Sequence, residues 1–417
     1  MARRLAPDSR IRAVGWGFGS QISSSAKNLL LTLIAARALG PDGLGIVVLG
    51  FALYLFAIGL NRALIVEPLI VLSSGVEPSA RRSQDHLALT MTLSIGAVLS
   101  VILVGVGLLV PGAIAEAMLV FGPWIVPALL SDFWRSVLFR DERGVAGTAI
   151  DVAWLAAMAL ALGAAWPIGT TWAVVAAWGI GALASAITGF FLTELRPGSL
   201  RGSALWGGRE AWPLGRWLMA EQLVYHVNVQ GQTLAIAATL GSAAVGGFGA
   251  VLTVYAPLSV LIPAISVSGL PAISRAVRLS ITSARDWAIK LSAIGVALTL
   301  GYVASMSLLG KGVLSTVFGT EFESYEDLIL PVGLQQVLGV ATLGAVLLLK
   351  GVLAPRLIVL VRAVVMAPAI ATTIFVGLYG DLELVAWAVV AWTGVLFVLM
   401  ALAARSASGR FDASSWY

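Results

Sequence analysis

The sequence predicts an all-α polytopic membrane protein with about twelve transmembrane helices in two six-helix lobes, related by a pseudo-two-fold axis along the membrane normal. Three observations predict this fold: composition, loop charge and an internal repeat. Of 417 residues, 59% are hydrophobic and 11% charged, and the mean hydropathy is +0.96. Soluble domains carry about 25% charged residues. The composition therefore excludes a cytosolic enzyme, a nucleic-acid-binding protein and a disordered chain.

Apolar runs separated by Gly, Pro and charged residues indicate the individual spans. A bilayer is crossed by about 20 apolar residues in a helix, and the runs meet this length. We place the spans near 14–38, 44–72, 87–110, 114–138, 145–166, 171–192, 214–239, 244–270, 287–309, 325–349, 356–379 and 382–404.

The distribution of basic residues supports this assignment. With both termini in the cytoplasm, the predicted cytoplasmic segments and adjoining helix ends carry 22 of the 26 Lys and Arg residues. The exceptions are Arg37 and Lys311 in outer loops and Lys27 and Arg62 within spans. Because cytoplasmic loops of membrane proteins are enriched in Lys and Arg, the alternation predicts twelve spans. The chain has no cysteine, which excludes disulfides and thiolate metal sites.

The two halves begin with related sequences. Residues 32–40 and 233–241 are identical at five of nine positions, and the same offset pairs Gln21 with Gln222. Six spans per half give both halves the same orientation, so their axis runs along the membrane normal. We expect an N-terminal lobe, a cytoplasmic linker, a C-terminal lobe and a cytoplasmic tail, at 1–193, 194–213, 214–404 and 405–417.

Polar side chains form a stripe on the first span and another on the seventh. Because polar groups are costly in hydrocarbon, each stripe must face protein or water. We expect the stripes to line a shared hydrophilic cavity, whereas the alternative is that they bond to neighbouring helices. The candidate substrate-binding residues are Gln21, Ser24, Lys27, Asn28, Arg62, Tyr225, Asn228 and Gln232.

Several charged residues within the spans have two interpretations. Lys27 lies near mid-membrane, where a charge costs about 2.5–3.5 kcal/mol, so it either attracts an anion or pairs with Glu67 or Glu221. Arg62 is equally a cavity cation or a member of a structural pair, and its spacing points it away from Glu67. Glu67, Glu221 and His226 are candidate ion-coupling residues.

Other spans carry residues to which we assign structural roles. Asp132 and Arg135 are three residues apart and could pair along their helix. Asp151 is placed close to the cytoplasmic interface, where water would solvate it. Small side chains in the sixth span predict a close helix contact; they are Gly181, Ser185 and Gly189.

The segment from Gln21 to Gly45 resembles the first span of bacterial polysaccharide-lipid flippases of the O-antigen type. These belong to the multidrug/oligosaccharidyl-lipid/polysaccharide (MOP) flippase superfamily. The segment from Asn61 to Pro68 resembles the second span of actinobacterial members. The resemblance implies two lobes around a cationic cavity lined by helices 1, 2, 7 and 8, where Lys27 and Arg62 meet an anionic headgroup. The seventh span departs from this pattern, with Glu221 and Asn228 where a second cation is expected.

We therefore predict a flippase that moves a polyprenyl-diphosphate-linked oligosaccharide, a polysaccharide repeat unit, from the cytoplasmic to the outer leaflet by alternating access. It would reside in the bacterial plasma (inner) membrane and would not be an enzyme. No cofactor or metal is expected, and the sequence contains no phosphate-binding G-x-x-x-x-G-K-[ST] motif. Expected partners are the lipid-linked oligosaccharide and membrane lipids, with a polysaccharide polymerase and glycosyltransferases as candidates, and no nucleic acid.

Two other functions remain open. A cation-coupled multidrug or small-molecule exporter would share the fold but would favour acidic cavity residues. A membrane glycosyltransferase or ligase would need catalytic acids in an external loop. The only acidic outer loop predicted is 310–327.

Overall fold

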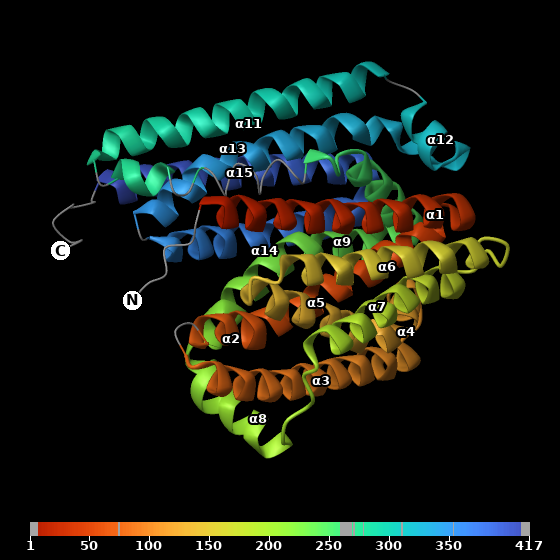
Figure 1. The fold of residues 1–417 in the computed structure, drawn as a ribbon. Coiled ribbons are helices and arrows are strands. Elements are labelled where there is room, and N and C mark those ends of the chain that lie inside the picture. The colour runs from red at the N-terminus through yellow and green to blue at the C-terminus, as the bar shows by residue number, and fades with distance from the viewer. Residues whose placement is uncertain are drawn as a thin grey trace. The chain divides into compact units, whose positions relative to one another are not determined.

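A computed structural model describes residues 7–73, 76–258, 269, 272–277, 279–309, 312–352 and 354–409, with side chains from Ser23 onward. All regular elements in this range are helices (Figure 1). The chain divides into two compact units, Met1–His226 and Val227–Tyr417. We call them unit 1 and unit 2.

The elements through the start of α9 belong to unit 1. They are α1 (Pro7–Asn61), the π-helical turn η1 (Arg62–Val66), α2 (Glu67–Leu72), α3 (Pro78–Leu109), α4 (Ala113–Phe121), the 3₁₀ turn η2 (Gly122–Trp124), α5 (Ile125–Arg140), α6 (Gly144–Ala165), α7 (Thr171–Thr193), α8 (Leu200–Trp206), the π-helical turn η3 (Gly207–Ala211) and α9 (Trp212–Val254). Unit 2 continues with α11 (Ile281–Leu309), α12 (Val313–Phe318), the 3₁₀ helix η4 (Thr320–Leu328), α13 (Ile329–Gly351), α14 (Pro355–Tyr379) and α15 (Leu382–Gly409).

Ten helical stretches in the described ranges are long and apolar enough to cross a membrane, and two of them, Ser23–Leu72 and Leu200–Val254, have 50 and 55 residues. Each of these two bends at a glycine: Gly40 has φ 66° and ψ −170°, and Gly241 has φ 85° and ψ −179°. Only glycine adopts this backbone region readily. The first stretch therefore contains predicted spans 1 and 2, and the second contains span 7 and the first part of span 8, so the ten stretches are compatible with the predicted twelve. Span 8 is described only in part.

The two bends also support the internal repeat. Gly40 and Gly241 are the aligned final residues of the two matching segments, and both adopt the same unusual backbone conformation. The chain is thus an all-α membrane protein in which each half begins with a helix bent at the same glycine.

Unit 1 owes its close packing to glycines on α7, which lies against α5 and α6. A Cβ added to Gly181 would lie 2.5 Å from the Trp154 ring, and one added to Gly189 would lie 2.4 Å from the Trp134 ring. Only the absence of these side chains lets the two tryptophans lie against the backbone of α7. The close contact predicted from this stripe of small residues is confirmed.

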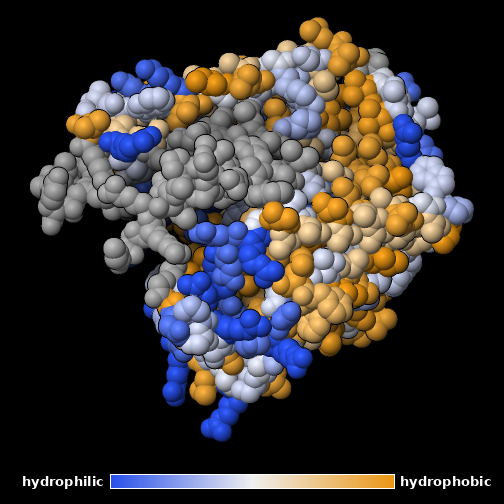
Figure 2. All heavy atoms as spheres, in the orientation of Figure 1, coloured by the Kyte–Doolittle hydropathy of each residue, from blue (hydrophilic) through white to orange (hydrophobic). Residues whose placement is uncertain are grey.

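The outer surface of unit 1 has an apolar flank and a hydrophilic end. Figure 2 shows hydrophobic side chains over the flank formed by α4, α6 and α7, and hydrophilic side chains near α2, α3 and α8. Leu160 and Ile187 are among the exposed apolar residues of the flank. A soluble protein rarely exposes so large an apolar patch, whereas a membrane-facing surface requires one.

The predicted linker, 194–213, forms helix α8 and turn η3 and packs on α3. The Gly198 amide donates to the His86 carbonyl at 3.0 Å, and the Thr90 hydroxyl donates to the Gly198 carbonyl at 3.2 Å. The boundary between the two compact units lies further along the sequence, between His226 and Val227 inside α9. The lobe boundaries predicted from composition remain a prediction.

In unit 2, α13 packs against α11, α14 and α15. The predicted acidic loop, 310–327, is folded over most of its described length as α12 and η4. The Gly312 amide donates to the Glu326 carboxylate at 2.5 Å, and Phe318 and Phe322 anchor the segment as buried side chains. One acid of this loop thus stabilises the start of α12.

Candidate functional site

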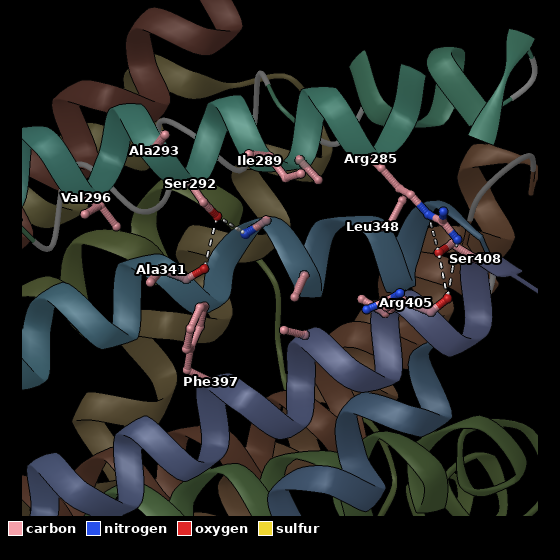
Figure 3. A pocket seen from close by; sticks show the side chains of 15 residues that line it. Arg285, Ile289, Ser292, Ala293, Val296, Ala341, Leu348, Phe397, Arg405 and Ser408 are labelled. Atoms are coloured by element: carbon pink, nitrogen blue, oxygen red, sulfur yellow. Dashed lines mark hydrogen bonds between the residues drawn. The ribbon is translucent and has the colours of Figure 1, made fainter. Parts of the chain in front are cut away.

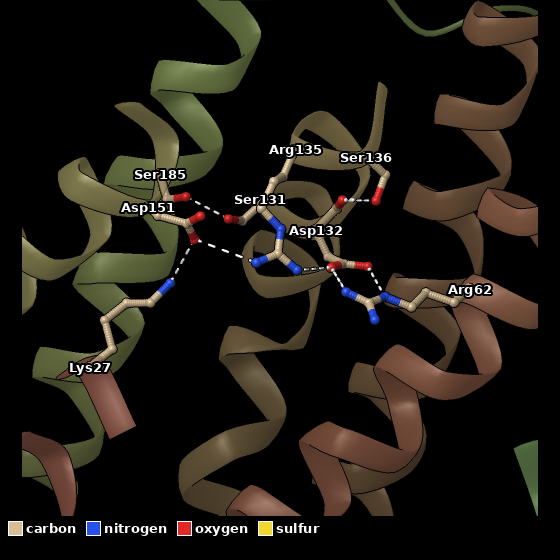
Figure 4. A network of polar contacts seen from close by, with 8 residues as sticks. All are labelled: Lys27, Arg62, Ser131, Asp132, Arg135, Ser136, Asp151 and Ser185. Carbon is tan, nitrogen blue, oxygen red and sulfur yellow. Dashed lines mark hydrogen bonds and ion pairs between the residues drawn. The ribbon is translucent and has the colours of Figure 1, made fainter. Parts of the chain in front are cut away.

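Five charged side chains of unit 1 form a continuous network (Figure 4). Lys27 Nζ lies 2.9 Å from Asp151 Oδ1, which also lies 3.6 Å from Arg135 Nη1. Arg135 Nη2 lies 3.0 Å from Asp132 Oδ1. Arg62 completes the network by donating from Nε to Asp132 Oδ2 at 2.8 Å and from Nη2 to Asp132 Oδ1 at 2.5 Å. Arg135 is therefore the bridge between two ion pairs.

Four elements position these side chains. Lys27 comes from α1, Arg62 from the first position of η1, Asp132 and Arg135 from α5, and Asp151 from α6. The α5 pair is fixed by its i, i+3 spacing, which brings the side chains together on one helix face. The other contacts exist because α1 packs against both α5 and α6.

The carboxylates are the most buried members of the network. The side chains of Asp132 and Asp151 are 3% and 1% exposed, whereas that of Arg62 is 38% exposed. Buried carboxylates are tolerated only when they are paired and hydrogen-bonded, and each has two cationic neighbours here. Three cations against two anions leave the network with one excess positive charge.

The network borders a cavity of about 150 Å³. Its lining combines polar and aromatic side chains: Ser24, Lys27, Asn28, Phe51, Tyr54, Leu55, Ile58, Arg62, Arg135, Trp154 and Trp178. The Lys27 ammonium lies 4.4 Å from the centroid of the Trp154 ring, close enough for a cation–π interaction. At about 30 Å³ per water, the cavity has room for a few waters or a small anionic group.

The structure brings four of the predicted substrate-binding residues together on this cavity. They are Ser24, Lys27, Asn28 and Arg62. Gln21 lies in the part of α1 whose side chains fall outside the description. Tyr225, Asn228 and Gln232 lie on α9, where Tyr225 is exposed and the other two are half-buried. Their role in substrate binding remains a prediction.

The candidate ion-coupling residues have different surroundings. His226 is buried against α1: its ring centroid lies 6.3 Å from that of Phe56, and its Nε2 would lie 2.3 Å from a Cβ added to Gly59. Glu67 is half-buried and Glu221 exposed. Ion coupling by any of the three remains a prediction.

Two expectations about the charged residues are wrong and one is confirmed. Lys27 pairs with Asp151 rather than with Glu67 or Glu221. Asp151 is not solvated, because it lies on the face of α6 that packs against α1 and α5. The predicted pairing of Asp132 with Arg135 is confirmed.

The anionic half of the site was not among the residues predicted to form it. Asp132 and Asp151 each hold a predicted substrate-binding cation, yet neither was a candidate site residue. One available signal was the spacing of Asp151 and Trp154, which places both on one face of α6. Trp154 there contacts the same lysine that Asp151 binds.

No protein-family model and no curated protein matches the sequence. Solved structures do match its fold. An inward-facing multidrug resistance MATE family transporter of the MOP superfamily superposes with a TM-score of 0.73 and 13% identity, covering 93% of this chain and 95% of its own. The lipid II flippase MurJ, in an inward closed conformation, superposes with a TM-score of 0.74 and 10% identity, covering 94% of this chain and 87% of its own.

A MOP superfamily transporter from Pyrococcus furiosus, described as having a binding pocket of reverse polarity, gives a TM-score of 0.63 and 12% identity over 97% and 96% of the two chains. These likenesses span nearly the whole length of each protein. The chain therefore has the two-lobe, all-α fold of MOP superfamily transporters.

Proposed function

We propose that this protein is an alternating-access flippase that moves a polyprenyl-diphosphate-linked oligosaccharide from the cytoplasmic to the outer leaflet. The observation that carries the proposal is a cavity lined by three cations, Lys27, Arg62 and Arg135, which pair with two buried carboxylates. It lies inside a fold that MOP superfamily transporters share. An excess positive charge inside a membrane protein favours an anionic substrate group.

The physical problem such a protein solves is desolvation. Moving a bare ion from water into a medium like hydrocarbon costs on the order of 20 kcal/mol. A polar cavity lowers this barrier by offering the diphosphate cations in place of water, while the lipid tail stays in the bilayer. Rocking of one lobe against the other would open the cavity to each side in turn.

Arg62 is the residue best placed to receive a phosphate. It is the most exposed cation of the network, and it already binds a carboxylate through two nitrogens. A guanidinium binds phosphate in the same bidentate manner. If a phosphate took over Arg62, Asp132 would keep Arg135 as its partner at 3.0 Å, so the exchange leaves no buried carboxylate unpaired.

Other polar side chains would contact the headgroup. Ser24 and Asn28, which line the same cavity, would hydrogen-bond it, with Gln21, Tyr225, Asn228 and Gln232 as further contacts. With a negative cell interior, export of each anionic charge gains about 2.3 kcal/mol per 100 mV. The protein would lie in the bacterial plasma membrane with cytoplasmic termini, next to a polymerase and glycosyltransferases.

Cation-coupled multidrug export is the second candidate function. It is favoured by the equally good match to a multidrug resistance MATE family transporter. The acids Glu67 and Glu221 and the buried His226 would then couple transport to a cation. The glycosyltransferase alternative has less support, because Glu326 of the acidic segment already caps α12 and the matching solved structures are transporters.

Leaflet transfer in vesicles tests the proposal. The purified chain is reconstituted with a fluorescent polyprenyl-diphosphate oligosaccharide, and the fraction accessible to a membrane-impermeant quencher is followed. We expect transfer above that of empty vesicles. Absence of transfer would contradict the proposal, and saturable efflux of a lipophilic cation drug in its place would establish the multidrug alternative.

Variants of the network locate the activity. Lys27→Ala and Arg62→Ala should each lower the initial rate about tenfold or more, the loss expected for removing one charged contact worth about 1.5–3 kcal/mol. Arg135 still pairs with Asp151 and Asp132 in these variants, so the fold should persist. Arg82→Ala, an exposed arginine on α3, is the matched control and should keep the wild-type rate.

A further inference from the structure

Unit 2 contains a second cavity, of about 640 Å³, between α11, α13 and α15 (Figure 3). This volume lies within the range of about 300–1,000 Å³ typical of sites for small organic ligands. The space exists because small side chains face it from all three helices: Ala288, Ala293, Ala341, Gly344, Ala345, Ala401 and Ala404.

Hydrogen bonds hold the walls of this cavity at a fixed separation. The Ser292 hydroxyl of α11 donates to the Ala341 carbonyl at 3.0 Å and accepts from the Gly344 amide at 2.9 Å, both on α13. A Cβ added to Gly344 would lie 2.2 Å from the Ala288 carbonyl oxygen. The two helices are thus already in backbone contact beside the cavity, so it cannot close by moving them together.

The two ends of the cavity differ in chemistry. Arg285 of α11 and Arg405 of α15 lie at one end, whereas Val296 and Phe397 lie toward the other (Figure 3). Arg285 Nε donates to the Ser408 hydroxyl at 2.8 Å, and its Nη2 donates to the Arg405 carbonyl at 3.4 Å. Within the part of the chain that the structure describes, no ion pair to a carboxylate engages either guanidinium.

An apolar cavity with two cations at one end matches an amphipathic anion. The predicted orientation places Arg285 and Arg405 at the cytoplasmic surface, where anionic phospholipid headgroups are found. Basic pockets between transmembrane helices on that side bind such headgroups. A phosphate could accept from the free positions of both guanidinium groups while an acyl chain lies against the alanine-rich walls.

We propose that the cavity between α11, α13 and α15 binds one anionic membrane phospholipid, with its phosphate between Arg285 and Arg405 and an acyl chain along the apolar walls. The site goes beyond the proposed transport function, because it lies wholly in unit 2 and shares no residue with the ion-pair network. A bound lipid would fill the cavity and supply the anion that the two arginines lack.

Native mass spectrometry of the full chain, released from detergent in the presence of defined lipids, tests this proposal. Phosphatidylglycerol, phosphatidylcholine and a polyprenyl phosphate are titrated separately. We expect one phosphatidylglycerol to bind at least tenfold more tightly than phosphatidylcholine. Equal binding of the two phospholipids would overturn the proposal. Preferential binding of polyprenyl phosphate would also overturn it, and would assign the cavity to an isoprenoid lipid.

Substitutions distinguish the headgroup contact from a purely structural role of the arginines. At about 1 kcal/mol per basic residue near the membrane surface, Arg405→Ala should weaken phosphatidylglycerol binding about fivefold and Arg285→Ala/Arg405→Ala about 30-fold. Ser408→Ala breaks the hydrogen bond between α11 and α15 but keeps both charges, so it should bind as the wild type does. Unchanged binding in the double variant would overturn the proposal.

Two further variants test the tail and the specificity of charge. Ala345→Phe places a ring in the cavity and should reduce the bound fraction of phosphatidylglycerol, while Arg356→Ala removes an exposed arginine of α14 that does not line it and should leave binding unchanged. A full bound fraction in Ala345→Phe, with its melting temperature preserved, would place the lipid elsewhere. If Arg356→Ala weakened phosphatidylglycerol binding as much as Arg405→Ala does, the preference would come from general surface charge and the proposal would be overturned.

Discussion

The interiors of the two units differ although both begin with a helix bent at an equivalent glycine. In unit 1, ion pairs connect α1, η1, α5 and α6 through Lys27, Arg62, Asp132, Arg135 and Asp151. In unit 2, alanines and a glycine surround a larger apolar cavity, and Arg285 at its end donates to the Ser408 hydroxyl and the Arg405 carbonyl. A repeated backbone thus carries two different kinds of interior.

The two interiors are stabilised by interactions that respond differently to mutation. Buried charges contribute little net stability, since their desolvation offsets their attraction, yet the loss of one partner is costly. A site in which an anionic ligand replaces one carboxylate partner requires ion pairs whose net contribution to stability is small. Packing through small residues depends on contact area and tolerates single changes better. We therefore expect mutations in the two units to differ most where charge is involved.

The largest effect should follow Asp132→Ala in unit 1. This variant removes the carboxylate that pairs with Arg62 and one of the two carboxylates that pair with Arg135. Breaking a buried ion pair costs about 3–5 kcal/mol, and the free energy of unfolding in mixed micelles should fall by this amount. Asp286→Ala, an exposed carboxylate of α11 in unit 2, is the control and should change it by less than about 0.5 kcal/mol. Equal effects would remove the distinction between the units.

The two bent helices should respond alike, whichever unit they begin. Gly40→Ala and Gly241→Ala force a Cβ into a backbone region that costs about 1–3 kcal/mol, and each should lower the unfolding free energy by that amount. Gly163→Ala and Gly301→Ala are matched controls in α6 and α11, because a Cβ there meets nothing within 4 Å. If only one bend proved sensitive, the structural equivalence of the halves would be contradicted.

A smaller effect is expected for Ser292→Ala, which removes the hydroxyl joining α11 to α13. Hydrogen bonds between transmembrane helices contribute about 0.6 kcal/mol on average, so the loss in unfolding free energy should be near this value. The same micelle titration measures it. A loss above about 2 kcal/mol would show that unit 2 also depends on a critical polar contact.

The smallest effect should follow Arg81→Ala in unit 1. Its guanidinium lies 3.8 Å from Asp141, and both side chains are about one-third exposed. Exposed ion pairs contribute about 0–1 kcal/mol, and Asp141 keeps Arg140 at 2.9 Å. The unfolding free energy should change by less than about 0.5 kcal/mol. A loss comparable to that of Asp132→Ala would mean that burial does not separate the two kinds of ion pair.

Most of the fold could be predicted because it depends on properties local to each segment. The length of the apolar runs and the alternation of Lys and Arg between successive loops predicted the spans, and the aligned Gly40 and Gly241 indicated the repeat. In the site, the i, i+3 pair of Asp132 and Arg135 was predictable for the same reason. The partner of Lys27 was not, because Asp151 is 124 positions away and only the packing of α1 on α6 brings them together.

The π-helical turn η1 has a consequence for insertions and deletions in this region. The Glu67 amide donates to the Arg62 carbonyl, five residues back, so this turn holds one residue more than an α-helical turn would. Deleting one residue from 62–66 would therefore restore an ordinary α-helical turn and keep Leu69 on the core side of α2, whereas inserting one further residue would turn α2 by about 100° away from the core. The length of this segment is therefore constrained mainly against insertion. Its composition directs Arg62 to Asp132 on one side and buries Ile65 and Val66 on the other.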